Sequence, residues 1–251
     1  KKRPMKRIHF HMSTLAIIIF LPLFIFTSCS GLFNTPRHLT LKVGFRKGHT
    51  EIRNFIETDG YYFCDSDYYS WYCSRNMLFY DDGSFSFFHW KNKDSKYGFR
   101  SLSKMTHVED SISRQPNVNL ADNIQPVYYE EWNWKRLVGG SYIIDGNRLI
   151  TESPCIFNSK WSVCRNYFRI VDRRTLLREV WELVSDDYSV RFDSTAVFRF
   201  IPANNPPDQT FMMAKDKKWM WRNKNEWKDE RTRRKAIWKA YRKAHNISLW
   251  H

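Results

Sequence analysis

The sequence has little glycine and proline, with nine of each in 251 residues, and neither recurs at a fixed spacing. This excludes collagen-like chains, and the lack of any internal repeat excludes solenoid arrays. The GxSxG, HExxH, Walker and dinucleotide-binding motifs are also missing from the sequence. We therefore expect a non-enzymatic protein that has no cofactor and no metal site.

Long apolar runs are missing as well: none in the sequence reaches the length of about 20 apolar residues that a membrane-spanning helix needs. The candidate run covers residues 15–26 and contains Pro22. It follows a start that is rich in basic residues and free of acidic ones: Lys1, Lys2, Arg3, Lys6 and Arg7. This pattern is typical of a signal peptide, which we predict over residues 1–28, with a short membrane anchor as the alternative.

The residues that end this run, Phe26-Thr27-Ser28-Cys29, resemble the lipobox of bacterial lipoproteins. The resemblance implies that Cys29 is lipidated, becomes the new N-terminus and attaches the protein to a membrane. Ser30, rather than Asp, follows Cys29. By resemblance to a sorting rule of some bacteria, this implies an outer-membrane lipoprotein of the cell envelope that faces the periplasm. The alternative is a Cys that merely lies near the end of a signal peptide.

Basic residues outnumber acidic ones by 41 to 26, which gives a formal net charge of +15. The first 28 residues contribute +5 and residues 215–243 contribute +9, which leaves about +1 for the rest of the chain. Because the body of the protein is nearly neutral, a nucleic-acid-binding surface across the fold is disfavoured. We expect no nucleic-acid partner.

Hydrophobic residues at 42% and aromatic residues at 17% indicate a folded chain. Short apolar segments bounded by turn residues predict strands at 61–64, 77–80, 85–90, 167–171, 176–184 and 190–200. One predicted hairpin turns at residues 81–84. A second has Asp145-Gly146 at its centre, as in a type I′ turn. About eight such strands in succession avoid exposed edges by closing into a barrel.

Four segments look like lipocalin-like lipoproteins of the bacterial envelope: Gly60-Tyr61-Tyr62, the hairpins 78–85 and 140–147, and Phe198-Arg199-Phe200. The resemblance covers about residues 50–202 and implies an all-β fold, an antiparallel lipocalin-like meander barrel. A β-sandwich is the alternative. We predict a tether at 29–49, the barrel at 50–202 and a basic, aromatic helical tail at 203–251.

A roomy barrel leaves a cavity, and aromatic walls suit an apolar or ring-bearing ligand. Candidate ligand-binding residues are Tyr61, Phe63, Phe79, Phe85, Phe87, His89, Trp132 and Trp134. Packing in the core is the alternative role for these side chains. Residues 101–126 interrupt the strands, and we interpret them as a lid over one barrel mouth or as an unstructured insertion.

The cysteines other than Cys29 form two pairs with the same spacing, Cys64 with Cys73 and Cys155 with Cys164. An even number in an exported protein predicts disulfides, and four cysteines allow three connectivities. Buried thiols are one alternative. A zinc site is another, although structural zinc sites use closer spacing.

The tail has the periodicity of an amphipathic helix, because Met220, Ile237 and four aromatic residues lie within one sector of a helical wheel. We predict that these aromatic residues contact anionic lipid at a membrane surface: Trp219, Trp227, Trp238 and Tyr241. Packing of the same stripe against the barrel is the alternative.

These patterns together predict a lipid-anchored, non-enzymatic cell-envelope protein whose barrel binds a small apolar ligand or an envelope component. The alternative is a structural or interaction lipoprotein with a filled barrel, whose basic C-terminal helix contacts anionic lipid or a protein partner.

Overall fold

The computed structural model describes residues 39–46, 51–64, 76–90, 116–120, 124–126, 138–157, 160–207, 209 and 212–244. Its main strands are β1 (Gly60–Cys64), β2 (Asn76–Phe79), β3 (Ser84–Trp90), β6 (Gly139–Asp145), β7 (Arg148–Phe157), β8 (Lys160–Asp172), β9 (Thr175–Val184) and β10 (Ser189–Asn204). The helical elements are η1 (Ile52–Asn54), η3 (Met213–Asp216), η4 (Lys218–Met220) and α4 (Lys224–Ala244).

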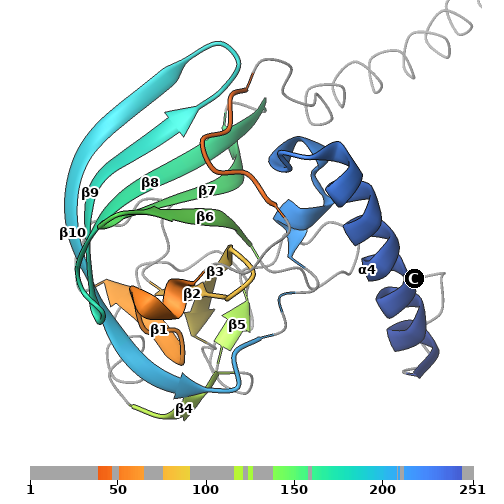
Figure 1. Ribbon diagram of the computed structural model, residues 1–251, viewed down its shortest axis with the longest axis horizontal. Coiled ribbons are helices and arrows are strands. Elements are labelled where there is room, and N and C mark those ends of the chain that lie inside the picture. Colours follow the sequence, from red (N-terminus) through yellow and green to blue (C-terminus); the bar gives the residue numbers. More distant parts are fainter. Residues whose placement is uncertain are drawn as a thin grey trace, which may run out of the picture.

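The main strands form one closed antiparallel barrel, with α4 beside it (Figure 1). Each strand pairs with the next along the chain, and β10 pairs with β1 from Gly60↔Pro202 to Cys64↔Phe198. Two short strands lie outside this circuit. β4 (Val118–Asn119) runs parallel to β10, and β5 (Ile124–Pro126) pairs with β3. The predicted meander barrel with a C-terminal helix is confirmed, and the β-sandwich is excluded.

The interior of the barrel is an aromatic core to which all eight main strands contribute. η1 and the residues after it cover one end of the barrel with Ile52 and Ile56, which are fully buried. We call this the closed end. The other core side chains are Tyr62, Cys64, Met77, Phe79, Phe85, Phe87, Tyr142, Leu149, Phe168, Leu176, Ala196 and Phe198.

The two predicted hairpins are present, but the second turn differs by one residue. In the first, Gly83 has a φ of 81°, which suits the last position of a short loop between β2 and β3. In the second, Asp145 pairs with Arg148, so Gly146-Asn147 forms the loop. Only Gly146 has positive φ, at 58°, which is typical of a type II′ turn rather than the predicted type I′.

Residues 39–46, which lie within the predicted tether, pack on the outer wall of the barrel instead. We call this segment the strap. Val43 is fully buried and Phe45 is 3% exposed. Phe45 also forms a parallel bridge with Trp221, close to the start of α4. The strap packs on the barrel and is not a tether because every second residue from Leu39 is apolar, which suits an extended segment with one face buried.

The predicted tail is not one continuous helix. β10 continues to Asn204, and two short 3-10 helices, η3 and η4, precede α4. Trp219 therefore lies in η4 and not on the amphipathic helix. Within the described part of the chain, no helix combines the length and the hydrophobicity that a bilayer crossing requires.

Candidate functional site

Three of the predicted ligand-binding residues lie inside the barrel, but they fill it rather than line a cavity. The rings of Phe85 and Phe87 meet edge to face at 5.1 Å between centroids, and the ring of Phe79 lies 6.0 Å from that of Phe85. These three side chains are at most 5% exposed. A cavity wide enough for a ligand would leave their surfaces accessible, so the closed end of the barrel is packed solid.

Tyr61 and Phe63 do not point into the barrel, which corrects the prediction for these two residues. They lie on the outer face of β1, in a second apolar cluster with Leu78 and Leu120. Apolar residues occupy both faces of β1, so alternation along the sequence did not reveal which face is inside. The side chain of His89, and residues Trp132 and Trp134, lie outside the described part of the structure.

The opposite end of the barrel, which we call the open end, has a different inner wall. Trp181 of β9 pairs with Phe192 of β10, and their rings stack at 4.8 Å. The Trp181 indole N–H donates to the Cys164 Sγ at 2.6 Å. Phe192 is 43% exposed and the neighbouring Val190 is 39% exposed. The candidate site is therefore this apolar patch of Trp181, Val190 and Phe192.

Polar side chains separate the open-end patch from the packed core. Asn166, which pairs with Trp181 across β8 and β9, donates to the Thr151 hydroxyl at 3.3 Å. Arg178 is 4% exposed, and its guanidinium lies 5.9 Å from the ring of Phe198. The inner wall thus changes from aromatic to polar and then to half-exposed apolar side chains toward the open end.

A buried carboxylate on the outer wall holds the strap in place. Glu152 of β7 is fully buried and accepts hydrogen bonds from the backbone amides of three strap residues: Lys42 at 2.9 Å, Val43 at 2.8 Å and Gly44 at 3.1 Å. Arg165 of β8 also donates to Glu152, at 2.7 Å. The strap is therefore attached through its backbone as well as through its apolar side chains.

Arg165 joins two carboxylates, because it also donates to Glu182 at 2.8 Å. Burial by itself lowers the pKa of Arg165, but the charge of Glu152 and the hydrogen bonds to Glu182 and Glu152 outweigh it and raise the pKa. Burial by itself raises the pKa of Glu182. Hydrogen bonds from Arg165 and from the Tyr167 hydroxyl outweigh it and hold that pKa below its usual value.

The depressed pKa of Glu182 predicts a pH-dependent stability. Its ionised form stabilises the fold above its unfolded-state pKa of about 4.3, and this contribution is lost as the pH falls through the folded-state value. We expect Glu182→Gln to lower the free energy of unfolding by about 1–2 kcal/mol at pH 7 and by less below about pH 4. Urea unfolding between pH 3 and pH 7 measures this. A difference that stays constant over this range would contradict the prediction.

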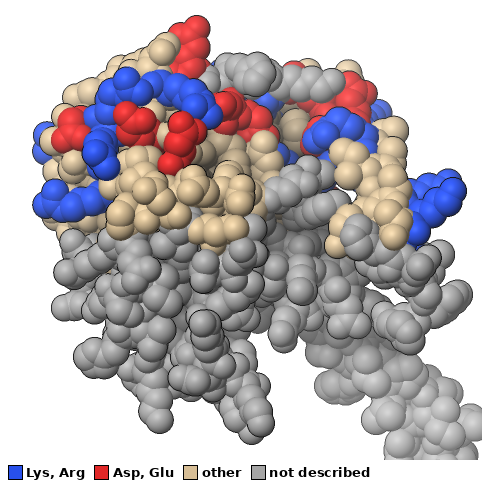
Figure 2. Space-filling view, turned by 90° about the horizontal axis from the view of Figure 1, so that it is seen from below, with Lys and Arg blue, Asp and Glu red and all other residues tan. Residues whose placement is uncertain are grey.

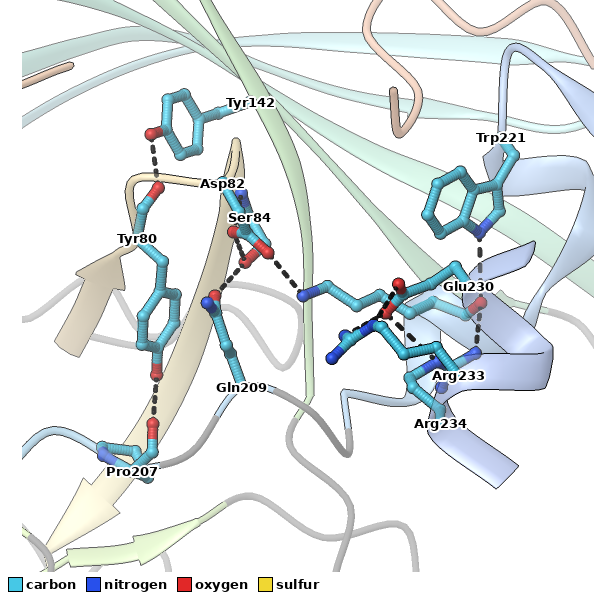
Figure 3. A network of polar contacts seen from close by, with 11 residues as sticks. Tyr80, Asp82, Ser84, Tyr142, Pro207, Gln209, Trp221, Glu230, Arg233 and Arg234 are labelled. Carbon is cyan, nitrogen blue, oxygen red and sulfur yellow. Dashed lines mark hydrogen bonds and ion pairs between the residues drawn. The ribbon is translucent and has the colours of Figure 1, made fainter. Parts of the chain in front are cut away.

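A second polar network attaches the base of α4 to the barrel (Figure 3). The Lys215 ammonium of η3 donates to Asp82 of the β2–β3 hairpin at 2.7 Å. Arg234 of α4 donates to the Lys215 carbonyl, also at 2.7 Å, and forms an ion pair with Asp216. The Trp221 indole N–H donates to the same carbonyl at 3.1 Å. The start of α4 is therefore fixed relative to the barrel.

The four predicted membrane-contact residues fall into two pairs. Trp219 lies against Trp161 at 6.2 Å, and Trp227 packs on the apolar cluster that covers the outer wall of the barrel. Trp219 and Trp227 therefore pack against the barrel, as in the alternative to membrane contact. Trp238 and Tyr241 lie further along α4, where their rings stack at 5.5 Å and Tyr241 is 42% exposed.

No disulfide joins the three cysteines that the structure describes, Cys64, Cys155 and Cys164. In the β7–β8 pair, Cys155 lies opposite Ser162 and Cys164 opposite Ser153, so the two cysteines are diagonal neighbours. Cys29 and Cys73 lie outside the described residues. No group of three or more potential metal ligands occurs within the described ranges.

Comparison with known proteins adds no relative, since no family model, no curated protein and no solved structure matches this chain.

Proposed function

We propose that this is a non-enzymatic, lipid-anchored protein of the bacterial cell envelope whose barrel binds a small apolar molecule at its open end. The observation that carries the proposal is the half-exposed apolar patch of Trp181, Val190 and Phe192 on the inner wall. Large apolar side chains that stay exposed on a concave wall are typical of a ligand site.

The two ends of the barrel support this assignment because they differ in kind. The closed end is covered by Ile52 and Ile56 and filled by packed rings. At the open end, the stacked rings of Trp181 and Phe192 offer a flat apolar surface. The ligand class that fits such a surface is an acyl chain or a planar ring without charge.

The anchor and the location in the envelope rest on the sequence. The lipobox-like residues Phe26-Thr27-Ser28-Cys29 support lipidation of Cys29, and Ser30 supports the outer membrane, with the barrel on the periplasmic side. A barrel attached in this way meets apolar molecules that leave or enter the bilayer.

Substitution of Phe192 tests the ligand site. We expect the purified protein to bind the neutral fluorescent probe N-phenyl-1-naphthylamine saturably, and Phe192→Ser to bind it about tenfold more weakly, because the aromatic contact is lost. Phe55→Ser is the matched control, since Phe55 is 39% exposed at the closed end. Equal loss in both variants, or no saturable binding by the unsubstituted protein, would refute the ligand site.

The second candidate is a structural or interaction lipoprotein with a filled barrel. The solid packing of Phe79, Phe85 and Phe87 favours it, because this part of the interior has no room for a ligand. Failure of the unsubstituted protein to bind the probe would favour this second candidate.

A further inference from the structure

We infer that the C-terminal two thirds of α4, residues 231–244, dock on an anionic lipid bilayer. We call these residues the docking segment. One of its supports, the anchor at Cys29, rests on the proposed function, while the others come from the helix itself. Its basic side chains meet lipid phosphates, and the stacked pair of Trp238 and Tyr241 lies at the boundary between headgroups and acyl chains.

The charge of α4 changes sharply along its length. Its acidic residues, Glu226, Asp229 and Glu230, all lie in the first third, and the docking segment has none. Arg233 and Arg234 are occupied by ion pairs with Glu230 and Asp216. The basic residues that remain in the docking segment are Arg231, Lys235, Lys239, Arg242 and Lys243.

These remaining basic residues form a stripe, because Arg231, Lys235, Lys239 and Lys243 follow one another at intervals of four along the helix. The three lysines are exposed, and none forms an ion pair with another described residue. At the right-hand edge of Figure 2, Lys and Arg side chains have no acidic side chain beside them among the coloured residues. Over the barrel, in contrast, basic and acidic side chains are mixed in this view.

The aromatic pair borders the stripe on the same helix. The Trp238 and Tyr241 rings stack with an angle of 19° between their planes, and the Arg242 guanidinium lies 6.0 Å from the Trp238 ring. A bilayer surface has phosphate headgroups, which bind basic side chains, and below them a boundary with the acyl chains, where aromatic side chains lie. A helix with basic and aromatic side chains next to each other fits both layers. A nucleic acid requires the positive charge but not this arrangement.

The strap places the docking segment within reach of the anchored bilayer. Leu39 packs on the cluster that includes Trp221 and Trp227, so the strap begins beside the base of α4. Leu39 is only ten positions after Cys29 in the sequence, which limits the distance between these two residues to about 35 Å. α4 has 21 residues and is about 32 Å long, so its far end is able to reach the bilayer.

Charge reversal in the docking segment tests the inference. Cys29→Ala is introduced into the full chain in every protein, so that no acyl group contributes to binding. We expect this protein to bind vesicles that contain phosphatidylglycerol at least tenfold better than vesicles of phosphatidylcholine. Adding Lys235→Glu and Lys239→Glu is expected to abolish the difference, because each basic residue near an anionic surface favours binding roughly fivefold.

The matched control carries Arg148→Glu and Arg199→Glu, two exposed positions on the barrel, and has the same net charge as the helix variant. It should keep the preference for anionic vesicles. Equal binding of the helix variant and the control, or no preference in the Cys29→Ala protein itself, would overturn the inference. So would a charge effect seen with a double-stranded oligonucleotide but not with vesicles.

If circular dichroism shows that the glutamate variant has lost structure, Lys235→Gln with Lys239→Gln replaces it under the same criteria. The mass of the peptide that contains Cys29, measured on the unsubstituted protein from cells, tests the anchor separately. An unmodified Cys29 would refute the anchor and leave the vesicle result standing, so the two failures are distinguishable.

Discussion

Glu152→Gln is expected to lower the free energy of unfolding by about 3–5 kcal/mol, because it removes one partner of a buried ion pair. The Arg165 guanidinium, 3% exposed, would lose the fully buried one of its two carboxylate partners and keep only Glu182. The new amide nitrogen would also face the backbone N–H groups of the strap, which are donors as well. Urea unfolding followed by tryptophan fluorescence measures the change.

The control for this prediction is Glu179→Gln, which breaks an ion pair of the same chemistry at the surface. Glu179 lies 2.9 Å from Arg169, but both side chains are more than 40% exposed. Exposed pairs contribute about 0–1 kcal/mol, so we expect little change. If the two substitutions had similar effects, the strap would not depend on the buried carboxylate.

Gly140→Ala is expected to prevent the barrel from closing, or to lower the free energy of unfolding by more than about 3 kcal/mol. Ordinary overpacking of a core lowers it by about 1–3 kcal/mol. A Cβ atom at Gly140 would lie 1.7 Å from the Glu152 carbonyl oxygen and 2.8 Å from the Ser153 Cα. Both are backbone atoms of β7, which is fixed by its pairing with β6 and β8. Relief of the contact requires β6 to separate from β7. Far-UV circular dichroism and the urea midpoint measure the loss.

Gly146→Ala provides the comparison, since it tests backbone conformation without a clash. No atom lies within 4 Å of a Cβ at Gly146, but its φ of 58° is unfavourable for alanine. We expect a loss of about 1–2 kcal/mol. A Gly140→Ala protein as stable as Gly146→Ala would show that β6 and β7 are not as close as the structure has them.

The barrel was predictable from the sequence because its signals are local. Each strand near 61–64, 77–80 and 85–90 is a short apolar segment bounded by turn residues, and the turns carry Gly83 and Gly146 at or next to the predicted positions. The side-chain period of two and the chemistry of tight turns act over a few residues, so one sequence suffices to read them. The strap carries the same period at residues 39–45, which the tether interpretation passed over.

The candidate site was not predictable in the same way, because it depends on irregular pairing. A register shift in the β8–β9 pair places Tyr167 opposite Val180 and Phe168 opposite Arg178. This shift puts Leu177 on the outer face and Trp181 on the inner face, although strict alternation along the strand would place both on one face. The shift leaves one residue of β9 without an opposite residue in β8. Nothing in the local sequence marks this extra residue, since the pairing of β9 with its two neighbouring strands decides where it is accommodated.

The sequence by itself therefore determined the number and order of the eight main strands, the closing of the sheet and the gathering of positive charge in α4, since these follow from periodicity and composition. The tertiary structure decided which aromatic residues fill the barrel and which remain exposed at its open end. It also decided that Glu152 and Arg165, far from the strap along the chain, bind it. These outcomes depend on contacts between residues distant in sequence, and a buried charge is stable only where such contacts supply its partners.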